Sequence, residues 1–372
     1  MSRKITNFAN QGGYSQPEKN ERSSNLELYR IIVMLLIVAH HYVVNSGLTA
    51  ADGPIFSDPL SAKSIFLLLY GMWGKTGINC FVLITGYFMC QSKITIKKFV
   101  KLLLEIYFYK IIIYFIFLLT GYSEFNAFSF VKMLFPITAI SDNFTACYLL
   151  FFLCIPFLNI LVYNMTEKQH RSLLALCCFM YVIIGTIPKF DVRFNYVTWF
   201  CVLFFIGSYL RFYPKNWFAN TKLWVGLMVI SIIASICSVI VMLCLGNRLN
   251  HPGVQYWFVA DSNKFLALVT AVTSFMLFKN INMKNSGFIN AVASSTFGVL
   301  LIHANSDTMR QWLWKDTLNN VGAYYSGFTY FHAIASVLAI FVICVLIDQL
   351  RIHLVEKPIF DWLSNYKWFI KN

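Results

Sequence analysis

The sequence predicts an all-α, polytopic integral membrane protein with about ten transmembrane helices and both termini in the cytoplasm. Hydrophobic residues make up 58% of the 372 residues and charged residues only 12%, whereas soluble domains carry about 25% charged residues. The mean hydropathy is +0.62. Because so few polar side chains cannot cover a water-soluble globule, much of the apolar surface must face lipid.

Ten apolar stretches are long enough to span a bilayer as helices. They are residues 26–45, 64–90, 98–120, 145–164, 171–188, 194–212, 222–245, 258–279, 287–305 and 329–353. We interpret residues 25–363 as one transmembrane domain, with no soluble domain attached. Residues 1–24, rich in Ser, Asn, Gln and charge, are predicted to form a disordered cytoplasmic tail, and residues 364–372 a second cytoplasmic tail. We expect no cleaved signal peptide, because no short apolar stretch with a cleavage site precedes the first span.

The formal net charge of +14 is distributed unevenly along the chain. With the N-terminus inside, 20 of the 30 Lys and Arg residues fall on the cytoplasmic side and nine outside, and only Lys110 lies in the middle of a predicted helix. This bias follows the positive-inside rule and favours both ends inside. The basic residues lie in short tracts between apolar stretches, without a nucleic-acid-binding motif. We therefore expect the lipid bilayer as a partner and no nucleic acid.

The ten cysteines do not predict a metal site. They lie within the apolar stretches, and none forms a C-x-x-C motif or pairs with His at the spacing of a zinc site. We interpret them as small apolar packing residues.

The first predicted helix carries polar residues along one face. Arg30 and His41 are eleven residues apart, which is about 20° past three full turns, and they are separated by about 16 Å along the axis. Glu27 lies one turn before Arg30 and can pair with it, whereas His40 is rotated about 80° away. Glu27, Arg30 and His41 thus form a stripe from the inner surface to the outer half of the bilayer. The alternative is that Arg30 extends to the inner interface while the histidines lie at the outer one.

The second and third predicted helices add further candidates. Gly74, Gly77 and Gly86 in the second allow neighbouring helices to approach closely. The third begins with Lys97, Lys98 and Lys101 on one face, at a helix N-terminus that is already electropositive. These lysines indicate either a cytoplasmic polyphosphate site or an anchor that obeys the positive-inside rule.

The ninth predicted helix contains His303 at a depth similar to that of His41. Two histidines at similar depth on separate helices can share one site, although a single histidine at a helix end is more often an interfacial residue.

These segments together resemble the acyltransferase 3 family of membrane-bound O-acyltransferases. Arg30 and His41 match the Arg, ten residues, His signature of the family, and Lys98 and Lys101 stand in the places of its R-x-x-R motif. Further family motifs are similar to residues 77–88, 148–159, 295–303 and 356–360. The resemblance extends, in order, over nearly the whole chain.

The resemblance implies transfer of an acyl group, in the first instance acetyl, from cytoplasmic acetyl-CoA to a hydroxyl of a cell-surface or cell-envelope polysaccharide. It implies that Lys97, Lys98 and Lys101, with Arg30, hold the phosphates of acetyl-CoA as co-substrate, without a metal. His41 would act as the general base. With it we assign Arg30, Glu27 and His303 to the catalytic set.

The same resemblance predicts the surroundings of the enzyme. We expect a multi-pass protein of the plasma membrane whose acceptor is a glycan or lipid-linked sugar, and which acts beside proteins of polysaccharide synthesis or export. The alternative is a polysaccharide exporter or flippase without acyl-transfer chemistry, which would have interrupted helices in corresponding halves of the chain. A membrane scaffold or sensor would leave the intramembrane Arg and His without a role.

Overall fold

A computed structural model of the chain describes residues 23–135, 144–188, 190, 192, 195–251 and 253–365. The predicted tail at 1–24 lies outside these residues except for Ser23 and Ser24. The predicted tail at 364–372 lies outside them except for Ser364 and Asn365.

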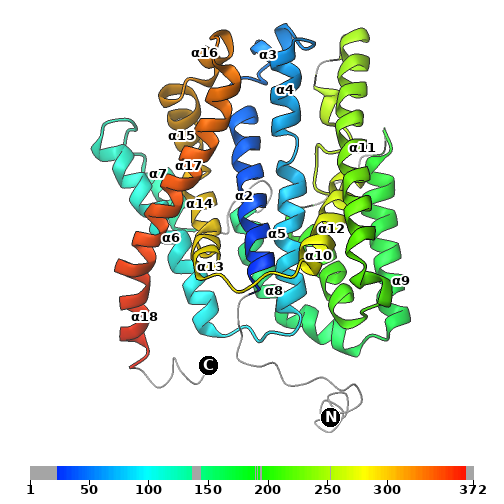
Figure 1. The fold of residues 1–372 in the computed structure, drawn as a ribbon. Helices are drawn as coiled ribbons and strands as arrows, with labels where there is room; N and C mark the ends of the chain where they lie inside the picture. The colour runs from blue at the N-terminus through cyan, green and yellow to red at the C-terminus, as the bar shows by residue number, and fades with distance from the viewer. Residues whose placement is uncertain are drawn as a thin grey trace.

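The described part of the chain is a bundle of helices without a strand. Helix α2 (Ser24–Val44) lies at its centre (Figure 1). The longer helices around it are α4 (Ala62–Gly71), α5 (Gly74–Met89), α6 (Ile96–Leu119), α8 (Phe144–Asn164), α9 (Glu167–Cys177), α10 (Tyr196–Phe212), α11 (Thr221–Arg248), α12 (Phe265–Asn280) and α17 (Thr329–Arg351). The shorter helices are α3 (Pro54–Ser57), α7 (Ala127–Leu134), α13 (Gly287–Ser294), α14 (Thr296–His303), α15 (Asp307–Arg310), α16 (Asn320–Tyr325) and α18 (Lys357–Leu363).

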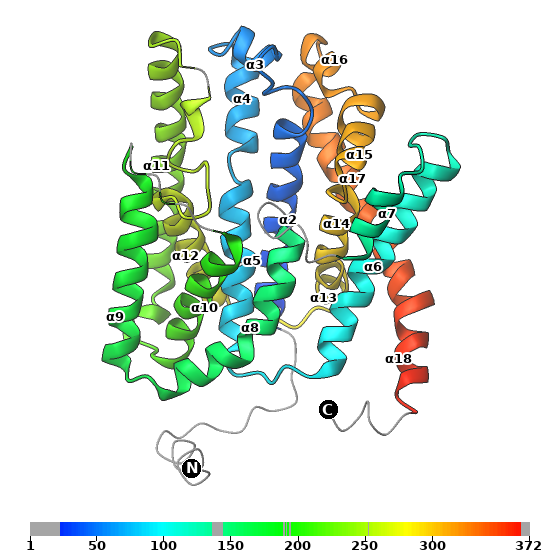
Figure 2. The ribbon, with the colours of Figure 1, turned by 180° about the vertical axis from the view of Figure 1, so that it is seen from behind.

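The bundle has two distinct ends, which are visible from both sides (Figures 1 and 2). Helices α3 and α16 lie at one end, which we call the α16 end. Helix α2 begins and α18 ends at the other, which we call the α18 end. The first and last described helices therefore meet the same end of the bundle.

All ten predicted apolar stretches contain helical segments, although α12 begins only at Phe265, within the stretch predicted at 258–279. Among the described residues, six helices are long and apolar enough to cross a membrane: Ser24–Val44, Ala62–Met89, Ile96–Leu119, Phe144–Asn164, Thr221–Arg248 and Thr329–Leu363. A seventh span is reached if Gly287–His303 and Asp307–Tyr325, which are bent by 93°, count as one. The helical membrane protein is thus confirmed, while the number of ten spans and the cytoplasmic location of the termini stay predictions.

Central helix α2 is surrounded because small residues let its neighbours approach. It contacts α4, α5, α12, α13, α14 and α17. A Cβ at Gly74 would overlap the ring of His40, and one at Gly77 would come within 2.8 Å of Ile37. On the other face of α5, a Cβ at Gly86 would come within 2.8 Å of the backbone of Phe204 in α10. The predicted role of these glycines in close helix packing is confirmed.

The bent pair brings a later segment of the chain back over the end of α2. Helix α14 ends at His303, and the chain then turns through 93° into α15. It continues as the wide π-helical turn η4 (Gln311–Thr317) and as α16. The Asn320 amide donates a hydrogen bond to the carbonyl oxygen of Tyr42 at 3.0 Å, which fastens α16 to the last turns of α2.

Candidate active site

A pair of histidines joins α2 to α14 inside the bundle. His41 lies in the last turn of α2, and His303 is the last residue of α14. Their Nδ1 and Nε2 atoms, respectively, are 2.9 Å apart. The side chain of His303 is fully buried. The structure therefore brings together the two histidines whose similar depth suggested a shared site, and it buries His303 inside the bundle.

The hydrogen bonds around His303 fix the proton positions of the pair. Nδ1 of His303 lies 2.6 Å from the carbonyl oxygen of Val299, and a carbonyl only accepts, so this nitrogen carries a proton. In a neutral imidazole the other nitrogen is then an acceptor. Nδ1 of His41 must donate to it, and Nε2 of His41 is left as an unprotonated nitrogen. The arrangement presents one basic nitrogen with a defined lone pair.

The segment that follows the bend after α14 places an aromatic residue, Trp314, and a cation, Arg310, beside the histidine pair. The ring of Trp314 packs edge-on against both His303, with centroids 6.3 Å apart, and Tyr42, at 6.0 Å. Trp314 is fully buried, and its indole N–H has no hydrogen-bond partner in the described part of the chain. The charge of Arg310, which pairs with Asp307 at 2.8 Å, acts on both imidazoles. This end of α2 therefore combines a base, a cation and an unsatisfied donor.

His40 has a different environment from its neighbour. Its Nδ1–H donates to the carbonyl oxygen of Gly71 at 2.6 Å, and its ring covers Gly74. It holds α2 against the short break between α4 and α5. This agrees with its predicted position away from the Arg30–His41 face.

The inner part of the predicted stripe is an ion pair. Nη1 of Arg30 donates to both carboxylate oxygens of Glu27 at 3.2 Å, which confirms the predicted pairing. Glu27 is buried, while the Arg30 side chain keeps 29% of its surface exposed. The guanidinium also acts electrostatically on the Tyr148 hydroxyl of α8. Arg30 and His41 remain separated by about 16 Å along α2, so one small group cannot touch both.

The three lysines at the start of α6 make different contacts. The Lys98 ammonium folds back onto the preceding loop, where it donates to Ser92 and to the Lys93 carbonyl, both at 2.8 Å. Lys101 pairs with Glu356 at 2.5 Å, and Lys97 lies 5.8 Å from the ring centre of Phe360. All three are exposed at the α18 end. They share a surface but do not converge on one point.

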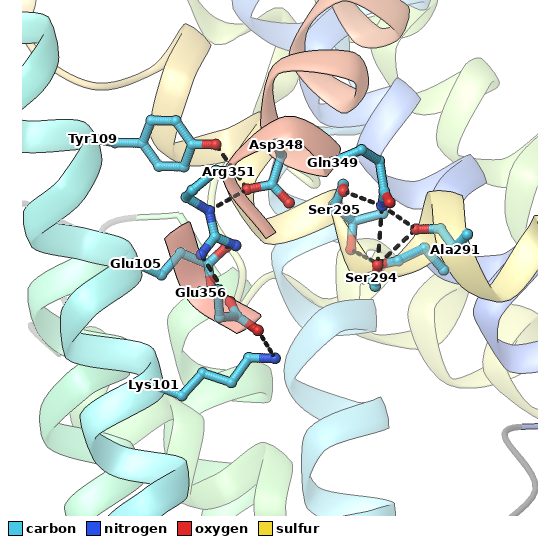
Figure 3. A network of polar contacts seen from close by, with 12 residues as sticks. Lys101, Glu105, Tyr109, Ala291, Ser294, Ser295, Asp348, Gln349, Arg351 and Glu356 are labelled. Atoms are coloured by element: carbon cyan, nitrogen blue, oxygen red, sulfur yellow. Dashed lines mark hydrogen bonds and ion pairs between the residues drawn. The ribbon is translucent and has the colours of Figure 1, made fainter. Parts of the chain in front are cut away.

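A buried ion-pair network, which the sequence reasoning missed, lies between α6 and α17 (Figure 3). At its centre, Arg351 donates to Asp348 and to Glu356, both at 2.8 Å, and lies 3.3 Å from Glu105. Tyr109 donates to Asp348 at 2.7 Å. Two signals could have revealed the network: Glu105 interrupts an apolar helix, and an acid and a base stand three residues apart at Asp348 and Arg351.

The network also contacts the helix that carries His303. A Cβ at Gly298 would overlap the Asp348 carboxylate, so Asp348 lies directly against α14. The neighbouring Gln349 points away from Arg351 and donates to the Ala291 carbonyl and to Ser295, at the break between α13 and α14 (Figure 3). Asp348 and Gln349, in one turn of α17, thus hold both α14 itself and the break between α13 and α14.

Residues 23–352 match the acyltransferase domain of the acyltransferase 3 family. The chain belongs to this family. The match includes α2 with Arg30 and His41, the start of α6, and α14 with His303, so the predicted family is confirmed. The protein is a membrane acyltransferase, and this assignment favours acyl transfer over the exporter interpretation.

No curated protein and no solved structure matches the chain significantly. Among the described residues, no group of three or more His, Cys, Asp or Glu side chains is placed to hold a metal ion.

Proposed function

We propose that this acyltransferase moves an acetyl group from cytoplasmic acetyl-CoA to a hydroxyl of a cell-envelope polysaccharide in the plasma membrane. The observation that carries the proposal is the His41–His303 pair. It leaves an unprotonated nitrogen on the same helix that presents Arg30 nearer the α18 end. A base near one end and cations at the other match a reaction whose donor and acceptor approach from opposite sides.

In the proposed reaction His41 is the general base. Nε2 of His41 removes the proton from the acceptor hydroxyl, and the oxygen attacks the thioester carbonyl. The C–S bond breaks, and the thiolate of CoA takes the proton from the His41 imidazolium to leave as free CoA. His303 does not touch the reacting atoms in this scheme; it is a positioning residue that keeps the His41 proton on Nδ1.

The donor would bind at the α18 end through exposed cations. Lys97, Lys98 and Lys101 are candidates for the CoA phosphates, and Arg30 for a group deeper along α2. Lysine acts on phosphate as a point charge and not through a planar bidentate contact. Three lysines that do not converge on one point therefore suit a flexible ligand with several phosphates. Glu356 already neutralises Lys101, so phosphate binding there competes with an ion pair.

The direct test replaces His41 by Ala at matched expression and compares acetylation of surface glycans by mass spectrometry. We expect acetylation to fall by about 10²-fold or more, because the general base is lost. His251→Ala, a change at an exposed histidine away from the pair, is the matched control and should retain wild-type acetylation. Wild-type acetylation in His41→Ala would refute the catalytic assignment.

Binding of acetyl-CoA to the purified protein separates the acyltransferase from an exporter. Calorimetry in detergent should detect saturable binding of acetyl-CoA. An exporter without acyl-transfer chemistry should bind none.

A further inference from the structure

We propose that a cavity at the α16 end binds one sugar unit of the acceptor glycan. The inference rests on the proposed function, because it specifies where the acceptor of that reaction is recognised. Two segments form the wall of this cavity: the loop after α2 and the η4–α16 segment. Both segments lead directly away from the histidine pair.

The cavity has a volume of about 310 Å³. Ser46, Asp52, Lys315, Asn319 and Tyr325 supply its polar lining. Small-molecule sites in proteins have volumes of about 300–1,000 Å³. This one therefore suits a single sugar ring and not a longer oligosaccharide.

Both walls of the cavity are continuous with the catalytic pair. Helix α2 ends at Val44, three residues after His41, and Ser46 already lines the cavity. On the other wall, Lys315 follows Trp314, whose ring packs against His303. A sugar in the cavity would therefore lie next to the end of α2 that carries the base.

The chemistry of the lining matches a polyhydroxylated ring. The Asp52 carboxylate accepts hydrogen bonds, the Lys315 ammonium donates them, and the phenol of Tyr325 does both. The opposite charges of Asp52 and Lys315 oppose a strongly anionic or cationic ligand. Tyr325 has 70% of its surface exposed, so its ring offers a flat apolar face to the C–H groups of a sugar.

A second cavity, of about 200 Å³, does not share this position. It lies between α3, which contributes Phe56, and the end of α11, with Met242 and Leu243 in its wall. Its lining includes neither the end of α2 nor the η4–α16 segment, so it does not lead to the histidine pair.

The test measures sugar binding to the purified full chain by saturation-transfer NMR. Methyl glucoside, methyl galactoside and N-acetylglucosamine serve as probes. We expect at least one probe to bind the wild type, and its affinity to fall by roughly three- to tenfold in Tyr325→Ala and in Asp52→Asn. Tyr325→Phe, which keeps the ring, should retain most of the binding.

Matched controls come from the same end of the bundle. Phe328 is 73% exposed, three residues from Tyr325, and lies outside the cavity lining. Asp58 is an exposed acid that follows α3 and also lies outside the lining. Phe328→Ala and Asp58→Asn should bind sugar as the wild type does. Thermal unfolding of each variant identifies any that is misfolded, and only folded variants enter the comparison.

Two outcomes would overturn the cavity assignment. One is that no probe binds the wild type; the other is that the lining variants bind like the controls. Neither outcome would contradict the proposed reaction, which is tested separately by acetyl-CoA binding and by the loss of transfer in His41→Ala. If sugar binding depends on Tyr325 and Asp52 but acetyl-CoA does not bind, the cavity assignment stands and the proposed reaction fails.

Discussion

At the scale of single residues, the decisive feature is that His303 fixes the tautomer of His41. The Val299 carbonyl accepts from Nδ1 of His303, and this bond determines which nitrogen of His41 is basic. A buried polar group that is fixed in this way costs little reorganisation when the reaction occurs. In the proposed reaction, His303 is therefore necessary for the correct tautomer of His41 and not for proton transfer itself.

Replacing His303 tests this role. In His303→Ala the proton of His41 loses its partner, and we expect kcat to fall by about 10²-fold. In His303→Gln the side-chain oxygen can accept from His41 Nδ1, so kcat should fall by only about tenfold. Rates are compared at saturating acetyl-CoA with purified protein. Equal losses in the two variants would show that His303 does more than orient His41.

The shared helix face of Arg30 and His41 could be predicted from the sequence, but the surroundings of His41 could not. The eleven-residue spacing places Arg30 and His41 on one helix face by the geometry of a single helix. The contact between His41 and His303 depends on how two distant helices pack, and similar depth only suggested it. Asp348 and Glu105 were missed because hydropathy averages over a window, and one acid in an apolar helix barely changes the average.

At the scale of the elements, α17 holds α14 in place. The carboxylate of Asp348 rests against Gly298, and Arg351 in turn ties Asp348 to α6 through Glu105. Buried charges of this kind are costly when one partner is lost. The network therefore resists any shift of α14, and with it any shift of His303.

Gly298→Ala tests this mechanical link. The added methyl group would overlap the Asp348 carboxylate, so we expect a loss of stability of about 1–3 kcal/mol. We also expect lower acyl-transfer activity, because α14 carries His303. Thermal unfolding in detergent and activity are the measurements. Gly226→Ala is the control, because a Cβ there meets nothing within 4 Å. Unchanged stability and activity in Gly298→Ala would contradict the link.

The start of α6 carries the predicted donor contacts. In a combined Lys97→Ala, Lys98→Ala and Lys101→Ala variant, we expect KM for acetyl-CoA to rise at least about tenfold with a smaller change in kcat. Added salt should weaken donor binding more in the wild type than in this variant, because exposed charge pairs are screened. Lys168→Ala serves as the control, because Lys168 is also exposed and lies just before the span predicted at 171–188, on its predicted cytoplasmic side. An unchanged KM would leave these lysines as topological anchors only.

At the scale of the whole molecule, composition and the hydropathy along the chain predicted a helical membrane protein and the approximate positions of its apolar helices. It did not predict the 93° bend after His303 or the break between α13 and α14. These breaks depend on contacts such as Gln349 with Ser295 and Asn320 with Tyr42, which join segments far apart in the sequence. The hydropathy of a segment contains no information about such contacts.

The bundle also separates the two halves of the proposed reaction. The lysines of α6 lie at the α18 end, while the histidine pair and the sugar cavity lie toward the α16 end. The proposed reaction therefore requires the acyl group to pass along the bundle beside α2, from a donor on one side to an acceptor on the other.

Reconstituted vesicles test this central claim most directly. Radiolabelled acetyl-CoA is supplied on the side of the α18 end and the acceptor glycan on the side of the α16 end, and label on the glycan is measured. We predict transfer by the wild type and a loss of about 10²-fold or more in His41→Ala at an equal amount of protein. Label transfer that is unchanged in His41→Ala, or that requires donor and acceptor on the same side, would contradict it.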